Sequence, residues 1–121
     1  MSLVSNRTAG ESQSVNRYRC PGLALTTLDQ GGLCELHLTL TPLPGEHWPD
    51  VWRRLHDVLR DEDARIAAQM VWGNLDTHAE ALGTLEREFG RITWPVTWTE
   101  GKDLRQRAWS GIQVWAVRGV P

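Results

Sequence analysis

The sequence predicts an α+β fold, with one mixed β-sheet and both helices packed on one face of it. Two segments have the apolar spacing of amphipathic helices, and several others alternate between apolar and polar residues as strands do. Their order is strand, strand, helix, strand, helix, strand, strand. Because strand-helix-strand connections are right-handed, the strands on either side of each helix are expected to run parallel. A chain of 121 residues holds one such domain and no second core.

The first part of the chain predicts an arm followed by two strands. Residues 1–16 are rich in Ser, Asn, Thr and Gly without a period, so we expect a flexible arm there and one domain over 17–121. An extended segment, 17–28, leads through the turn residues 29–32 into a second strand, 33–41. That strand carries its apolar side chains on one face: Cys34, Leu36, Leu38 and Leu40. One covered face is therefore expected for it.

Two helices and a strand come next. Residues 48–61 place an apolar stripe on one side, with Pro49 suited to the first turn. The stripe consists of Val51, Trp52, Leu55, Val58 and Leu59. Residues 65–72 read as a largely apolar strand that alternates at Ile66, Ala68, Met70 and Trp72. Thr77 and Glu80 have the spacing of a capping box, and Gly90 suits the end of a second helix whose stripe is Leu82, Leu85 and Phe89.

The last two strands lie within residues 92–117, which hold four of the seven tryptophans. Residues 92–99 alternate, whereas 112–117 are apolar on both faces apart from Gln113. The final strand is therefore predicted to be central and covered on both sides. Since two helices cover only one face of the sheet, its other face is left to water or to a second subunit, and tryptophan there favours the subunit.

Composition excludes several classes of function. The net charge is -2 and the two signs alternate along the chain, which argues against a nucleic-acid groove. No apolar run is long enough for a membrane span and no signal peptide is recognisable, so we expect a cytoplasmic protein. None of the four histidines has metal-ligand spacing, and we expect neither a metal nor a cofactor. Cys20 and Cys34 are predicted to be too far apart for a disulfide, and therefore to be free thiols.

The order and lengths of these elements resemble the Rid family, also called YjgF or L-PSP proteins. The similarity is carried by 48–61 with 67–72, by 76–89, and by Ile112-Gln113-Val114-Trp115-Ala116-Val117. It implies a chorismate-mutase-like domain that forms homotrimers, with the open faces of three sheets packed around a barrel-like core. It also implies small-molecule sites in the clefts between subunits. The chain would then be a free-standing member or one half of a longer Rid-like architecture.

The resemblance implies hydrolysis of enamines and imines such as 2-aminoacrylate, but leaves catalysis open for this chain. In active members an Arg in a Pro-x-Arg-Ser segment grips the substrate carboxylate, and a Glu on the last strand positions water. Here the first segment reads Trp94-Pro95-Val96-Thr97, and the glutamate positions match Gln113 and Trp115. Four other arginines are candidates to anchor the substrate carboxylate from a shifted position: Arg91, Arg105, Arg107 and Arg118.

We expect the cleft to be lined by Thr97, Thr99, Glu100, Gln113 and Trp115, with Trp98 as an apolar wall and Glu100 as the acid-base group of any reaction. His37 shares a strand face with Glu35, and a solvent-facing pair is expected there. The alternative function is a non-catalytic interaction module, a degenerate Rid-like domain that docks a protein partner through the tryptophan-bearing sheet face.

Overall fold

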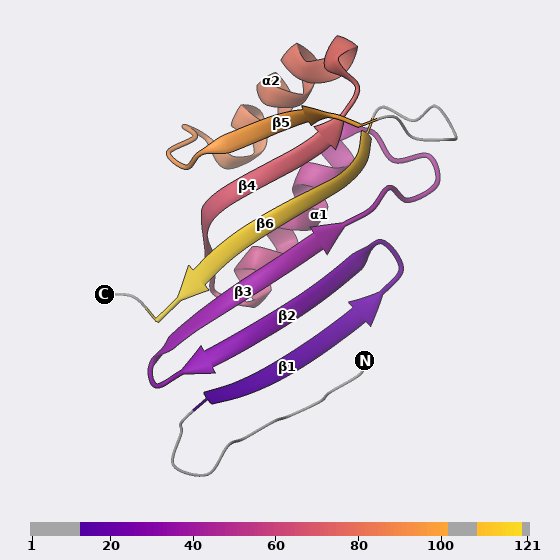
Figure 1. Cartoon of the computed structure of the whole chain (residues 1–121). Coiled ribbons are helices and arrows are strands. Elements are labelled where there is room, and N and C mark those ends of the chain that lie inside the picture. The colour runs from indigo at the N-terminus through magenta and orange to yellow at the C-terminus, as the bar shows by residue number, and fades with distance from the viewer. Residues whose placement is uncertain (1–12, 102–108, 120–121) are drawn as a thin grey trace.

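The computed structural model describes residues 13–101 and 109–119, which form a six-stranded sheet with two α-helices (Figure 1). The strands are β1 (Gln13–Cys20), β2 (Leu23–Gln30), β3 (Leu33–Leu40), β4 (Arg65–Gly73), β5 (Val96–Glu100) and β6 (Trp109–Arg118). The helices are α1 (Trp48–Asp61) and α2 (His78–Phe89), and a short 3-10 turn, η1 (Leu75–Thr77), precedes α2. The α+β class is confirmed, and Figure 1 shows both helices on the same face of the sheet.

The strand order across the sheet is β1-β2-β3-β6-β4-β5. Strands β1, β2 and β3 form an antiparallel meander, and β6 lies antiparallel between β3 and β4. It follows that β3 and β4 run in the same direction, and β4 pairs parallel with β5. Each helix therefore connects parallel strands, as predicted, and β6 is central. Neither helix of the described segments is long and apolar enough to cross a bilayer.

The N-terminal part differs from the prediction, because residues 17–28 form two strands instead of one. Cys20 pairs with Leu23 across a tight turn at Pro21 and Gly22. Gly22 has a φ of 74°, and a Cβ there would lie 2.7 Å from the Leu43 side chain, so the turn depends on glycine. Strand β1 begins at Gln13, so 13–16 belong to the sheet rather than to the expected arm. Residues 1–12 lie outside the described part.

The core lies between the sheet and the two helices. The apolar face of β3 is buried as predicted, and so are four of the five stripe residues of α1, Val58 being half-buried. Trp52 of α1 is 1% exposed and connects the helices, because its Nε1 donates to the Ala81 carbonyl at 3.1 Å and to Thr84 Oγ1 at 2.9 Å. The helix layer is thus fixed by both packing and hydrogen bonding.

The start of α2 differs from the predicted capping box. Thr77 caps no helix N–H with its side chain; its Oγ1 donates to the Asn74 carbonyl at 2.9 Å, and the Asn74 side chain accepts from Asp76 N. The residues that α2 buries are Ala81, Thr84 and Leu85, whereas Leu82 and Phe89 are half-buried. The C-cap prediction is confirmed, since Gly90 has a φ of 78° and its N–H bonds to the Glu86 carbonyl.

Strands β4 and β6 also depart from expectation. A register shift between Ile66 and Ala68 breaks the alternation of β4, so that Ile66 packs on the core while Met70 is exposed on the other face. The helix-side positions of β4 are instead Gln69 and Val71. In β6, Ile112, Val114 and Ala116 are buried whereas Gln113 and Trp115 are exposed. Within the described residues, the chain therefore covers only one side of this central strand.

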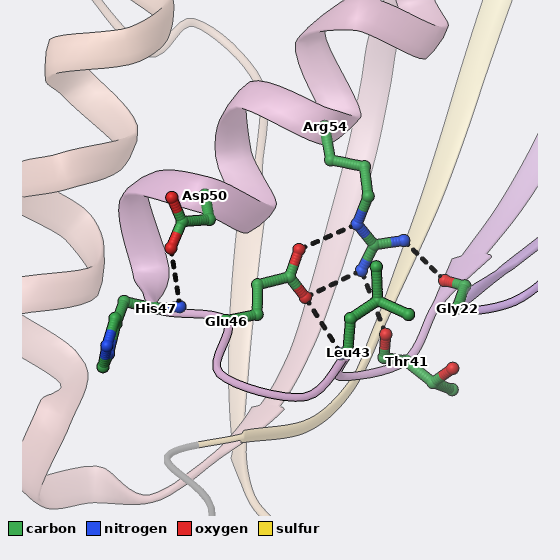
Figure 2. A network of polar contacts seen from close by, with 7 residues as sticks. All are labelled: Gly22, Thr41, Leu43, Glu46, His47, Asp50 and Arg54. Carbon is green, nitrogen blue, oxygen red and sulfur yellow. Dashed lines mark hydrogen bonds and ion pairs between the residues drawn. The ribbon is translucent and has the colours of Figure 1, made fainter.

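Arg54 joins α1 to the segment that precedes it and to the β1–β2 turn (Figure 2). Its guanidinium forms a two-pronged ion pair with Glu46, at 2.8 and 3.0 Å, and donates to the carbonyls of Gly22 and Thr41 at 2.7 and 3.0 Å. The Glu46 side chain is 6% exposed and also accepts from Leu43 N. Planar, bidentate pairing of this kind suits Arg and not Lys.

Replacement of Arg54 by Met should lower the free energy of unfolding by about 2–3 kcal/mol, because the buried Glu46 carboxylate and two carbonyls lose their donor. Denaturant unfolding measures this change. The matched control is Arg53→Met, which removes the same charge from an exposed neighbour and should cost no more than about 0.5 kcal/mol. Equal losses in the two variants would contradict a specific role for Arg54.

Candidate ligand site on the open face of the sheet

The sheet face opposite the helices, here called the open face, carries large apolar side chains on central strands. Trp115 of β6 is 44% exposed and Met70 of β4 is 37% exposed. Antiparallel sheets often leave one face in water, but such faces are usually polar. A tryptophan and a methionine on the middle strands therefore make this face more apolar than a water-facing sheet usually is.

Strand pairing places a set of polar and apolar side chains side by side on the open face. One row across the sheet joins Thr39, Gln113, Met70 and Thr97 from four neighbouring strands. The next row joins His37, Trp115 and Ala68. These two rows, together with Pro95, line a hollow of about 320 Å³, within the range of small-molecule sites.

His37 and Trp115 form one wall of the hollow. They are directly opposite on β3 and β6, with ring centroids 6.4 Å apart and ring planes within 7° of parallel. Offset stacking of this kind between cross-strand neighbours limits the orientations available to the Trp115 ring. The ring of His37 therefore stacks on that of Trp115. Glu35, the expected partner of His37, does not line the hollow.

The chemistry of the hollow is that of a largely neutral site. Thr39 and Thr97 offer hydroxyls, Gln113 offers an amide, and His37 is the one titratable side chain among the described lining residues. These residues include no carboxylate and no guanidinium. The hollow can hold a small polar molecule by hydrogen bonds and an apolar part against Trp115, but a bound carboxylate would need its cation from elsewhere.

The structure brings together three of the six residues predicted for the site, Thr97, Gln113 and Trp115. Thr99 faces the same side of β5 but lies outside the lining. Trp98 and Glu100 lie on the helix-covered side, because successive residues of a strand point to opposite faces. Trp98 packs against Trp48 and His78, with ring centroids 5.6 and 4.7 Å apart, and Glu100 Oε2 accepts from Leu75 N at 2.9 Å. These two residues therefore do not join the hollow.

The arginines considered as a carboxylate anchor do not line the hollow either. Arg118 lies at the end of β6, where it donates to the Glu62 carbonyl at 3.0 Å, and Arg91 is exposed beyond α2. Arg105 and Arg107 fall outside the described residues. Among the lining residues that were not predicted for the site, His37, Thr39 and Met70 come from β3 and β4. The only signal for His37 and Thr39 in the sequence was the alternation of polar with apolar residues along β3.

Metal and thiol chemistry find little support in the described segments. No group of three His, Cys, Asp or Glu side chains there is arranged to hold a metal ion. Cys20 and Cys34 are free, as expected. Cys34 is 3% exposed, and burial raises the pKa of its thiol, an effect that the nearby Arg118 only partly offsets. A buried thiol of raised pKa is a poor nucleophile.

Comparison of the chain with protein-family models, with curated proteins and with solved structures finds no match. The site must therefore be interpreted from its own geometry.

The two thiols should differ in reactivity. In native protein at about pH 8, Ellman's reagent should modify the half-buried Cys20 at least about tenfold faster than Cys34, because only exposed thiolate reacts. Cys20→Ser should abolish the fast phase and Cys34→Ser should preserve it. Since the folded pKa of Cys34 is raised, its contribution to stability is complete below the unfolded thiol pKa of about 8.5 and declines as the pH rises further. Equally fast modification of both thiols would refute this assignment.

Proposed function

We propose that this chain is a divergent Rid-type homotrimer that binds a small metabolite in clefts between its subunits. The observation that supports it best is the exposed pair Trp115 and Met70 on the central strands of the open face. In such a trimer the open faces pack together, and the hollow on each chain becomes part of a cleft. The element order and the placement of both helices on the opposite face are compatible with this assembly.

The energetics favour covering this face. A tryptophan buries roughly 150–250 Å² when enclosed, so covering the exposed part of Trp115 would contribute about 2 kcal/mol per subunit at about 25 cal/mol per Å². Covering Met70 adds to this. In a closed symmetric trimer the open face of every subunit would lie at an interface, so the same apolar patch would be covered on all three chains.

The proposal concerns binding and leaves the reaction undefined. Enamine or imine hydrolysis is what the resemblance implies, but the hollow offers His37 as its one titratable group. Glu100 has no role in the proposal, because its carboxylate bonds to Leu75 N on the other side of β5. Within the described residues, recognition of a ligand therefore rests on Thr39, Thr97 and Gln113, with Trp115 as the apolar wall.

The alternative function is a non-catalytic module that docks a protein partner through the same open face. The neutral lining favours it, since the hollow lacks the charged pair that an acid-base reaction on a carboxylate substrate would use. The two functions differ in what covers Trp115: another copy of the chain or a different protein.

Light scattering after gel filtration should give a mass close to three times the 13.7 kDa of one chain. Trp115→Glu should reduce this to the monomer mass, because three carboxylates would be buried near one another at the interfaces. Leu75→Glu is the matched control: Leu75 is 58% exposed, it lies on η1 outside the hollow, and its replacement should leave the mass unchanged. A wild-type monomer would reject the trimer and favour the docking module.

Pyruvate should raise the melting temperature of the wild-type protein by roughly 3–6 °C at about ten times its Kd, since ligand binding to the folded state stabilises it by mass action. Thermal shift measurements with pyruvate, and with acetone as a neutral analogue, test this. Gln113→Leu should remove the shift without changing the mass. A trimer that shows no shift with pyruvate would retain the assembly and reject a small keto acid as ligand.

A further inference from the structure

A second hollow, of about 550 Å³ and here called the helix-side hollow, lies mainly among the helices and reaches the start of β4, where Arg65 pairs with Val117 of β6. It is bounded by the second half of α1, the end of α2, the start of β4 and the segment that follows α2. Its apolar surface includes Leu59, Ile66, Phe89 and Trp94. Nothing in the proposed function uses it.

The aromatic wall of this helix-side hollow is held in place within the chain. Phe89 and Trp94 meet edge to face, with centroids 5.6 Å apart and planes at 83°. Trp94 Nε1 donates to Oε1 of the buried Gln69 at 3.0 Å, which fixes the indole. Preorganised rings of this kind bind a flat apolar group with little loss of side-chain entropy.

The charged lining of the helix-side hollow has a single sign. Among the residues that the structure describes, Arg60, Arg65 and His56 line it, and no carboxylate does. His56 is already paired with Glu88 at 2.8 Å. Arg60 contacts Asp57 at 2.9 Å, but the two side chains are 66% and 50% exposed, so this ion pair is weak. Arg65 is exposed, and its side chain forms no hydrogen bond or ion pair within the described residues.

We infer that the helix-side hollow binds a small aromatic carboxylate. The aromatic ring lies against Phe89 and Trp94, and the carboxylate pairs with the guanidinium of Arg65, with Arg60 as a second cation. A guanidinium that pairs with no described side chain can match a carboxylate in a planar, two-pronged geometry. The apolar surface explains why the ligand carries a ring, and the absence of acidic lining residues explains why it is an anion.

Isothermal titration calorimetry with 3-phenylpropionate, and with 3-phenylpropanamide as its neutral analogue, tests this inference. The acid should bind at least about tenfold more tightly than the amide, a difference typical of one charge-assisted hydrogen-bonded pair. Arg65→Gln should remove most of that difference and leave the amide unchanged. Arg60→Gln should lower the affinity for the acid by a smaller factor. Phe89→Leu should lower the affinities for the acid and for the amide by similar factors.

The matched control is Arg53→Gln, because Arg53 is an exposed arginine of α1 that does not line the hollow. It should leave the affinity for the acid unchanged. Equal affinities for acid and amide, an acid affinity that survives both Arg65→Gln and Arg60→Gln, or no measurable binding would each overturn the inference. If 3-phenylpropionate bound only on the open face, Arg65→Gln would leave its affinity unchanged. That result would overturn the helix-side site and leave the proposed function standing.

Discussion

The arrangement of this protein depends on the contact that Trp52 makes between the two helices. Its indole is buried, stacks on Trp48 with centroids 5.3 Å apart, and donates to the Ala81 carbonyl and the Thr84 hydroxyl of α2. Trp48 in turn contacts Trp98 of β5 and Trp109 of β6. One aromatic cluster therefore joins both helices to strands β5 and β6 of the sheet. With both helices fixed on one side, no element of the described chain remains to cover the other.

The sequence predicted those elements whose structure follows from local patterns. The predicted bounds of α1 were correct because its apolar stripe and the position of Pro49 indicate the same helix. The alternation of apolar and polar residues along β3 correctly predicted which of its faces is buried. The errors arose where distant parts of the chain decide the backbone. The turn at Gly22 packs on Leu43, and the shift in β4 accommodates its partner β6. The capping box failed because η1 uses Thr77 to bond back to Asn74.

The open-face hollow was predictable only within single strands. Alternation correctly placed Thr97 beside Thr99, and Gln113 beside Trp115, on common faces, but the same alternation turns Trp98 and Glu100 away from them. The contribution of His37 and Met70 depends on the registers of β3 and β4 against β6, which join residues more than forty positions apart. No local pattern specifies such pairing, since each register must also satisfy the core beneath it.

The two outer strands of the sheet carry features that oppose pairing with a further strand. Within the described residues β1 pairs only with β2, and β5 pairs only with β4. Strand β1 carries Arg17 and Arg19, both exposed, while β5 has five residues and directly follows Pro95. Charge, shortness and proline all discourage strand addition at an edge. Open-ended growth of fibrils by strand pairing at these two edges is thereby disfavoured.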